Sequence, residues 1–383
     1  MAVIFIEPGG DATQSVANPG LFSAVVGTVA YATDQAYTGA GSIKCTSDVV
    51  ANAYFNKAGV MADTGRRVSF HFRFDTLPDA DLKLTPLEID QAGGATCFGL
   101  TIRTTGKLAI YDKNNVVQAT GNTVLAVNTW YRISVVYNIT SGSVNSISVY
   151  LNGTPEVTAS NITVNTASNY IYFGGQIETV AGANTWHTWT DNIYIDDGTS
   201  GDPGNICVTA KRPVANGTLN DWVTQIGSGG SGYGAGHSPQ VNERPTSTTN
   251  GWSIQSASLK VEEYSIEGKA VGDADISNAQ ILDFMGWVYA KVGVSNTGNI
   301  VVAGAATNIS LTTSYFIYTQ IAGTSTYPTG GNDIGMDNNS VNQLFSLAEC
   351  GIVVAYIPSV STPALVSTVP SYSFGYKDQV TAY

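Results

Sequence analysis

Residues 66–77 read RRVSFHFRFDTL, and the alternation in this stretch decides the fold class. Its apolar members fall at every second position: Val68, Phe70, Phe72 and Phe74. Successive side chains of a strand point to opposite faces, so the pattern predicts a strand with one buried face. His71 falls on the polar face, where we expect a solvated surface histidine.

Strand patterns recur on both sides of this stretch. They are AVIFIE (2–7), AGSIKCTS (40–47), CFGLTIRTTGKLAIYD (97–112), TWYRISVVYNIT (129–140), SISVYLNGTPE (146–156), NYIYFGG (169–175) and TWTDNIYIDDG (188–198). Thr105-Gly106 and Asn152-Gly153 supply hairpin turns. Many short strands, each with one face to bury, predict an all-β sandwich over residues 1–198.

The chain changes character after residue 198. A stretch rich in Gly, Ser, Asn and Pro follows and indicates a domain boundary with a long irregular loop. Strand patterns then return, which predicts a second β-rich domain at 199–357. Pro363 and Pro370 interrupt residues 358–383, which show no period, so we expect an extended C-terminal arm.

Composition excludes several classes of function. The chain has 383 residues, only 17 Lys and Arg, and a net charge of −12, which disfavours nucleic acid as a partner. The opening MAVIFIEPGG lacks a basic n-region, and no apolar run is long enough for a membrane span, so neither a signal peptide nor a membrane partner is expected. The cysteines (Cys45, Cys97, Cys207, Cys350) lack zinc-ligand spacing; buried thiols are expected, and a Cys45–Cys97 bridge stays open.

The motif order in residues 1–198 resembles a LamG or concanavalin A-like jelly roll. The motifs are F-x-F (72–74), FGLTI (98–102), GKLAIYD (106–112), NTWYRISVVYN (128–138), SVYLNG (148–153) and W-x-DNIYID (189–196). The resemblance implies a sandwich of two curved sheets. LamG-like domains often hold a rim calcium ion, which the resemblance makes possible here.

A second resemblance covers residues 189–222. W-x-DNIYIDDGT (189–199), ICVTAKRP (206–213) and NDW (220–222) resemble a junction found in many tailed-phage virion proteins. Residues 205–207 read Asn-Ile-Cys where that family usually shows Asp-x-Arg, which is a departure. The resemblance implies a virion structural protein: a capsid decoration, a head fibre or a tail component.

The stretch LEIDQAGG (87–94) is the best candidate for catalysis, because an E-I-D core occurs in bacterial glucanases of the concanavalin-like class. Glu88 and Asp90 share one face of a strand. Retaining hydrolysis needs two carboxyl groups flanking the scissile bond. Positions 92–95 supply no further carboxylate, and Glu88 and Asp90 face solvent or a loop if Leu87 and Ile89 face the core. We therefore expect no catalytic residue.

Three further groups of residues are candidates for a metal, phosphate or glycan site. Asp191, Asp196, Asp197 and Asp202 are hard ligands that suit Ca²⁺, but the strand between Asp191 and Asp196 separates them too far to share one ion. GSGGSGYGAGHSP (227–239) lacks the Lys of a phosphate loop, and His237 and Glu243 are assigned no chemistry. Trp186, Trp189 and Tyr194 are either an aromatic platform for a glycan or packing at the sandwich end.

Together these patterns predict a non-enzymatic virion structural protein without a cofactor. It would be made in the host cytoplasm and act on the outside of a phage particle, by docking to major capsid or tail proteins and to copies of itself. The alternative is a carbohydrate-binding module of a phage tail or fibre, directed at a host-surface glycan.

Overall fold

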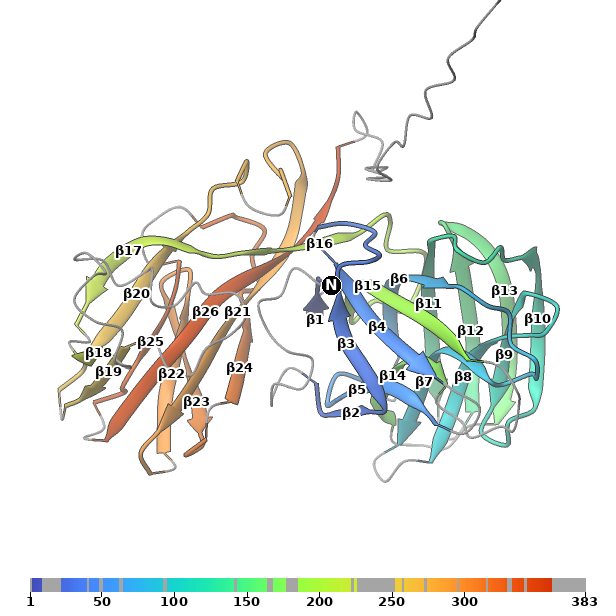
Figure 1. Ribbon diagram of the computed structural model, residues 1–383, viewed down its shortest axis with the longest axis horizontal. Coiled ribbons are helices and arrows are strands. Elements are labelled where there is room, and N and C mark those ends of the chain that lie inside the picture. Colours follow the sequence, from blue (N-terminus) through green and yellow to red (C-terminus); the bar gives the residue numbers. More distant parts are fainter. Residues whose placement is uncertain are drawn as a thin grey trace, which may run out of the picture.

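The stretch that decided the fold class is strand β6 (Arg66–Phe74) in the computed structural model, and it lies inside a large antiparallel sheet. The structure describes residues 2–8, 22–39, 41–47, 51–61, 65–91, 95–140, 143–163, 168–176, 185–221, 224–225, 252–256, 258–271, 274–294, 296–314, 316–328, 333–340 and 343–359. Within these residues the chain forms four antiparallel sheets and no helix, so the predicted all-β class is confirmed (Figure 1). None of the described residues forms a helix able to cross a membrane.

Two of these sheets form the first sandwich. Sheet 1 runs in the order β13 (Thr154–Thr163), β12 (Ser143–Leu151), β11 (Tyr131–Thr140), β6, β15 (Trp186–Asp196), β4 (Ser42–Ser47) and β3 (Thr28–Ala32), and β1 (Val3–Glu7) also pairs with β15. Sheet 2 runs in the order β10 (Val117–Val124), β9 (Lys107–Asp112), β8 (Thr96–Ile102), β7 (Leu84–Gln91), β14 (Ser168–Gln176), β5 (Ala53–Ala58) and β2 (Ala24–Val26). Pairs of consecutive strands such as β11–β12 and β8–β9 are joined by crossovers such as β6–β15 and β7–β14, as in a jelly roll.

The core of this sandwich follows the predicted alternation. The four apolar residues of β6 are at most 1% exposed, and Phe70 packs edge-on against Phe173 of β14 with ring centroids 5.2 Å apart. Leu87 and Ile89 of β7 are fully buried and lie opposite Phe173 and Ile171. The inward side of each strand is therefore fixed, and the alternate residues face outward.

The other two sheets lie in the second half of the chain. Sheet 3 runs in the order β18 (Thr224–Gln225), β19 (Trp252–Gln255), β26 (Leu344–Ile357), β21 (Gln280–Val292) and β24 (Phe316–Ile321), with β16 (Cys207–Lys211) also on β26. Sheet 4 runs in the order β17 (Pro213–Asn220), β20 (Val261–Ile266), β25 (Ile334–Asp337), β22 (Asn296–Val302) and β23 (Ala305–Leu311).

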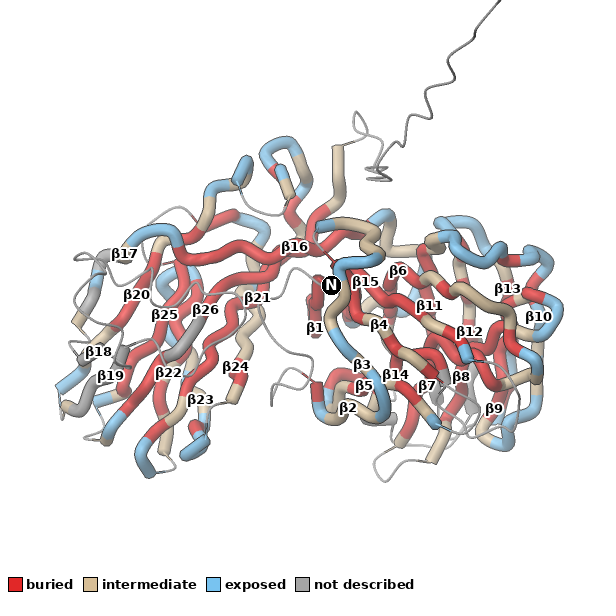
Figure 2. The backbone as a smooth tube through the Cα atoms, viewed as in Figure 1, coloured by how far each residue is buried: buried red, intermediate tan, exposed pale blue. Residues whose placement is uncertain are grey.

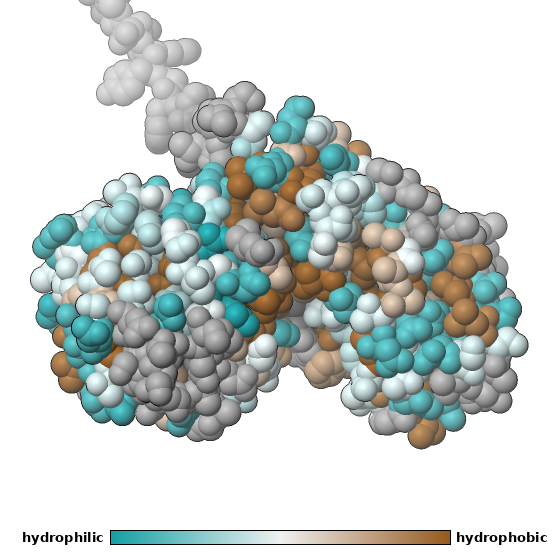
Figure 3. Space-filling model, turned by 180° about the vertical axis from the view of Figure 1, so that it is seen from behind, coloured by the Kyte–Doolittle hydropathy of each residue, from teal (hydrophilic) through white to brown (hydrophobic). Residues whose placement is uncertain are grey.

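Sheet 3 is buried on both faces. Phe284 and Val288 of β21 belong to a cluster shared with sheet 4, whereas Met285 and Trp287 belong to the same cluster as the first sandwich. Red, buried segments accordingly continue from one half into the other (Figure 2), and hydrophobic side chains gather between the halves when the molecule is seen from behind (Figure 3). The boundary at residue 198 remains a prediction, because the two halves share this apolar contact.

Several expectations lie wholly or largely outside the described residues. They are the loop 227–239, His237, Glu243 and most of the arm at 358–383. The cysteines are all described; each is buried and none forms a disulfide, which resolves the alternative left open for Cys45 and Cys97.

Candidate functional site

The three aromatic residues predicted as a glycan platform lie on β15 but do not meet on one surface. Trp186 is fully buried, with the Lys83 ammonium 4.6 Å from the centroid of its indole ring. Trp189 is 5% exposed, and Tyr194 is fully buried. A sugar ring needs an accessible aromatic face, so the described geometry gives these residues packing roles rather than an open platform.

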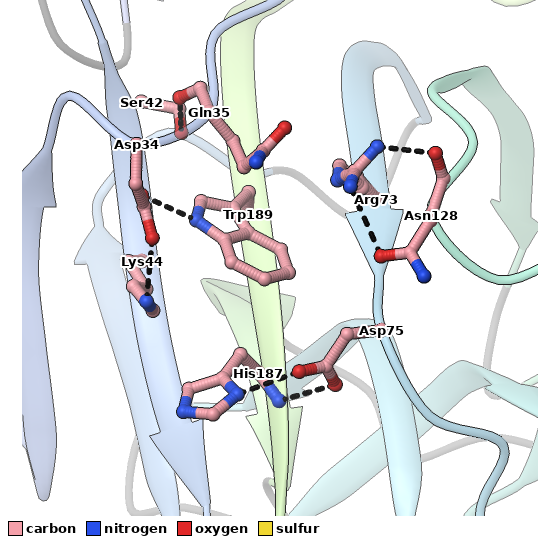
Figure 4. A network of polar contacts seen from close by, with 9 residues as sticks. All are labelled: Asp34, Gln35, Ser42, Lys44, Arg73, Asp75, Asn128, His187 and Trp189. Atoms are coloured by element: carbon pink, nitrogen blue, oxygen red, sulfur yellow. Dashed lines mark hydrogen bonds and ion pairs between the residues drawn. The ribbon is translucent and has the colours of Figure 1, made fainter.

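Trp189 lies on the outer face of sheet 1, inside a polar network (Figure 4). Its indole Nε1 donates to Asp34 at 3.0 Å, and Asp34 also accepts from Lys44 at 2.7 Å. The cationic groups of Lys44 and Arg73 lie 5.0 and 5.5 Å from the ring centroid. These long side chains cover the indole, which explains its low exposure.

Next to this network, His187 lies in a pair with Asp75. The imidazole Nδ1 is 2.6 Å from an Asp75 carboxylate oxygen, and the other carboxylate oxygen accepts from the His187 backbone N–H at 2.8 Å (Figure 4). The carboxylate therefore fixes both the ring and the strand at this point.

The acidic cluster considered for calcium is dispersed over the same face. Asp196 accepts two hydrogen bonds from Arg67, at 3.0 and 2.7 Å. Asp202 accepts two from Arg132, at 2.6 and 2.8 Å. Within the described residues no three His, Cys, Asp or Glu side chains are grouped for a metal. The Arg67 pair instead ties the end of β15 to β6, and the Arg132 pair ties the segment after β15 to β11.

Asp191 serves the β15 backbone and a neighbouring loop. Its carboxylate accepts from the backbone N–H groups of Tyr37 and Thr38, at 2.8 and 3.1 Å. Asn192 follows it with a φ of 52°, where β15 changes register against β6. The Asn192 amide oxygen accepts from Thr38 and from the Val208 N–H, at 2.8 and 2.6 Å, and so links β15 to β16.

The expectation of a solvated His71 is wrong. The Tyr37 ring stacks on the imidazole, with centroids 3.6 Å apart, and His71 is 1% exposed. Among the described residues, neither ring nitrogen has a hydrogen-bond partner. Burial first, and then the Arg132 charge, hold the pKa of His71 well below its usual value. The alternation of β6 placed His71 on the outer face correctly but could not show that a loop covers it.

The outer face of sheet 2 carries a different set of side chains. The strand register aligns one row across five strands: Asn56, Tyr172, Glu88, Gly99 and Tyr111. The next row aligns Tyr170 with Asp90 and Thr96. This face therefore brings the carboxylates of LEIDQAGG beside the tyrosines of NYIYFGG, which lie about 80 residues later in the chain.

Gly99 leaves room for the Tyr111 side chain to cross this row and reach Glu88. The Tyr111 side chain lies over Gly99, where a Cβ atom would come within 2.2 Å of the phenol oxygen. The phenol reaches across to donate to the Glu88 carboxylate, which also accepts from Thr96 at 3.2 Å. Glu88 and Asp90 are 2% and 4% exposed. They thus form the floor of this face instead of the solvated strand face that the sequence predicted.

Three half-buried tyrosines stand beside this floor. Tyr54 and Tyr172 meet edge to face with ring centroids 5.4 Å apart, and Tyr170 lies 6.2 Å from Tyr172. Burial, and then the neighbouring Asp90, raise the pKa of Tyr172 to about 12. We call this set the tyrosine face: Tyr54, Tyr170, Tyr172, Glu88 and Asp90. Its rings are accessible, unlike those of Trp186 and Tyr194.

The sequence carries a local signal for the shared face of these tyrosines. Tyr170 and Tyr172 alternate with the buried Ile171 and Phe173, so they had to share an outer face. What the sequence could not show is that β14 is the neighbour of β7, because strand order is a long-range property.

Comparisons with known proteins give only distant likenesses. No family of known domains matches the sequence, and no curated protein matches it. Among solved structures, an endo-β-1,4-glucuronan lyase from the fungus Trichoderma reesei has a TM-score of 0.40 and 12% identity, over 51% of this chain and 95% of the lyase. An alginate lyase from Aplysia kurodai has a TM-score of 0.38 and 12% identity, over 51% and 99%. A Trypanosoma rangeli sialidase has a TM-score of 0.33 and 14% identity, over 45% and 28%.

The expected role as a virion structural protein is corrected here, because nothing in the comparisons supports it. The similar structures are named as two lyases and a sialidase, and none of the three is named as part of a phage particle. The expectation rested on the short motifs at 189–222, one of which already departed from the pattern. Those motifs form most of β15, all of β16 and the two ends of β17, a local arrangement that does not specify a particle.

Proposed function

We propose that the first sandwich binds carbohydrate on the tyrosine face. The observation that carries this proposal is the alignment of half-buried tyrosines on β5 and β14 with two buried carboxylates on β7. Aromatic rings pack against the C–H faces of sugars, while a few fixed polar groups orient the hydroxyl groups. This arrangement supplies both kinds of contact on one surface.

The proposal is binding without cleavage. Glu88 is already engaged by the Tyr111 phenol and the Thr96 hydroxyl. Glu88 and Asp90 also lie two apart on one strand, so they stand on the same side of any ligand laid across the face. Cleavage by two carboxyl groups needs them to flank the scissile bond.

A glycan array followed by titration calorimetry with soluble polysaccharides tests the proposal. We expect Tyr172→Ala and Tyr54→Ala to weaken binding by about tenfold or more, the equivalent of about 1.4 kcal/mol. Tyr150→Ala is the matched control, because Tyr150 is a half-buried tyrosine on the outer face of the opposite sheet, across from Ser134.

Two results would refute the proposal. One is that no carbohydrate binds to the wild type; the other is binding that survives Tyr172→Ala as well as it survives Tyr150→Ala. Product analysis of the same mixtures by mass spectrometry should show intact polymer, and shortened chains would refute binding without cleavage.

A further inference from the structure

The placement of cationic groups in the first sandwich limits what the tyrosine face can bind. Every Lys and Arg of residues 1–198 is described. They are Lys44, Lys57, Arg66, Arg67, Arg73, Lys83, Arg103, Lys107, Lys113 and Arg132. The parts of residues 1–198 that are not described add acidic residues and no Lys or Arg.

Most of these cations belong elsewhere. Arg67 and Arg132 pair with acids on the outer face of sheet 1, where Lys44 and Arg73 also lie over Trp189. Lys57 and Lys83 lie over the buried rings of Phe5 and Trp186. Arg66 donates to the carbonyl oxygens of Val60 and Gly65.

The remaining three lie on β9 or just beyond the ends of β8 and β9, away from the rows of the tyrosine face. Arg103 forms an ion pair with Asp81 at 2.6 Å. Lys107 begins β9 four residues from Tyr111, which is about 13 Å along a strand. Lys113 lies in the turn after β9, beyond Asp112. No described cation therefore stands in the two rows that contain Glu88 and Asp90.

Tyr172 lies beside both carboxylates and responds to their charge. Its partner in the strand register is Glu88, and Asp90 lies in the next row. After burial, the Asp90 charge is the largest cause of its raised pKa, and Glu88 acts in the same direction. A negative charge is thus disfavoured at this point, and a ligand carboxylate in the same place would meet the same field.

We infer that the tyrosine face selects neutral sugars and rejects uronic acids and other acidic sugars. The buried carboxylates have hydroxyl groups as natural partners, since a carboxylate only accepts hydrogen bonds and a sugar hydroxyl can donate one. An acidic sugar would bring a further anion to rows in which no described residue supplies a cation to pair with it. This inference rests on the proposed function and names the substrate class of the same site.

The experiment compares one polymer backbone in two charge states. Polyglucuronate and alginate are titrated against the full-length protein beside their carboxyl-reduced forms, in which each uronate has become a neutral sugar. We expect a reduced form to bind at least about tenfold more tightly than its acidic parent at low salt. The Glu88→Gln/Asp90→Asn variant should lower the ratio of the affinity for the reduced polymer to the affinity for its acidic parent. Asp34→Asn, on the opposite sheet, should leave this ratio unchanged.

The outcomes separate this inference from the proposed function. Equal or tighter binding of the acidic polymers overturns the inference and leaves carbohydrate binding intact. Binding of no polymer refutes the proposed function itself. An unchanged ratio in the Glu88→Gln/Asp90→Asn variant also overturns the inference, because overall charge would then set the preference. If that variant does not fold, the single variant Glu88→Gln and a salt series on the wild type give the same decision, since salt screens the repulsion of exposed charges.

Discussion

The two outer faces of the first sandwich differ in how their charged side chains are paired. On sheet 1, charges are matched: Arg67 with Asp196, Arg132 with Asp202, and Lys44 with Asp34. On sheet 2, Glu88 and Asp90 face tyrosines and a threonine, with no described cation in their rows. The Arg132 pair ties sheet 1 to the segment that leads into the second half, whereas the two carboxylates of sheet 2 lie in rows without a described Lys or Arg.

This difference teaches that the buried carboxylates of one fold serve two purposes. Those that meet arginines tie β15 to β6 and the segment after β15 to β11. Those that meet hydroxyl groups have the proposed role of accepting hydrogen bonds from a ligand.

The largest effect is expected on sheet 1, at the Arg67 pair. Arg67→Met removes the partner of Asp196, whose side chain is fully buried. Leaving a buried charge unpaired destabilises a protein by about 3–5 kcal/mol. Urea unfolding should show this loss. The control Arg103→Met breaks a pair in which both side chains are about one third exposed, and should cost less than about 1 kcal/mol. Equal costs would show that the sheet 1 pairs are not structural ties.

The next effect is expected on sheet 2, at the glycine beneath Tyr111. Gly99→Ala places a Cβ atom against the phenol and displaces it from Glu88, so overpacking should cost about 1–3 kcal/mol. The same variant should weaken carbohydrate binding, because the floor of the tyrosine face moves. Gly268→Ala is the control, since its Cβ atom would meet nothing within 4 Å. A Gly99→Ala protein with wild-type stability would argue against the closed row.

His71 should make sheet 1 sensitive to acid. Its pKa in the folded state is lowered, so the unfolded chain binds the proton first and stability falls as pH drops below about 6.5. The expected slope is about 1.4 kcal/mol per pH unit until the folded pKa is reached. The groups around it are Tyr37, Arg132, Asp191 and Cys207.

Unfolding measured between pH 5 and 7.5 checks this slope. His71→Phe keeps a ring under Tyr37 and should remove it, whereas His187→Asn should retain it. The lowered pKa values of Asp34, Asp81 and Asp202 contribute only at more acidic pH, as each carboxylate takes up its proton. A slope that persists in His71→Phe would assign the acid sensitivity to another group.

The smallest effect is expected at the exposed end of sheet 1. Asp34→Asn weakens the contacts to Lys44 and Trp189, but the Asp34 side chain is 46% exposed. Exposed pairs contribute about 0.2–1 kcal/mol, so the midpoint of urea unfolding should barely move. A loss comparable to that of Arg67→Met would mean that the Trp189 network ties the sheet as strongly as the buried pairs.

The sequence predicted the parts of this fold that depend on local alternation. The buried face of β6 and the outward position of Glu88 and Asp90 followed from a period of two. Strand order did not follow, because the pairing of β14 with β7 joins residues far apart in the chain. For the same reason the cover that Tyr37 forms over His71 and the floor beneath Tyr172 were missed: each is made by a distant segment.

The four buried cysteines can report local unfolding of the chain through their reaction with an alkylating reagent. Burial raises the pKa of Cys45 and Cys207 to about 12, so almost no reactive thiolate is present near neutral pH while the chain is folded. An alkylating reagent can therefore label these thiols only when the chain around them transiently unfolds and exposes them. Cys45 and Cys97 lie in the first sandwich, and Cys207 and Cys350 in the core of the second half. The order in which the four sites become alkylated would show whether the halves open together or one before the other.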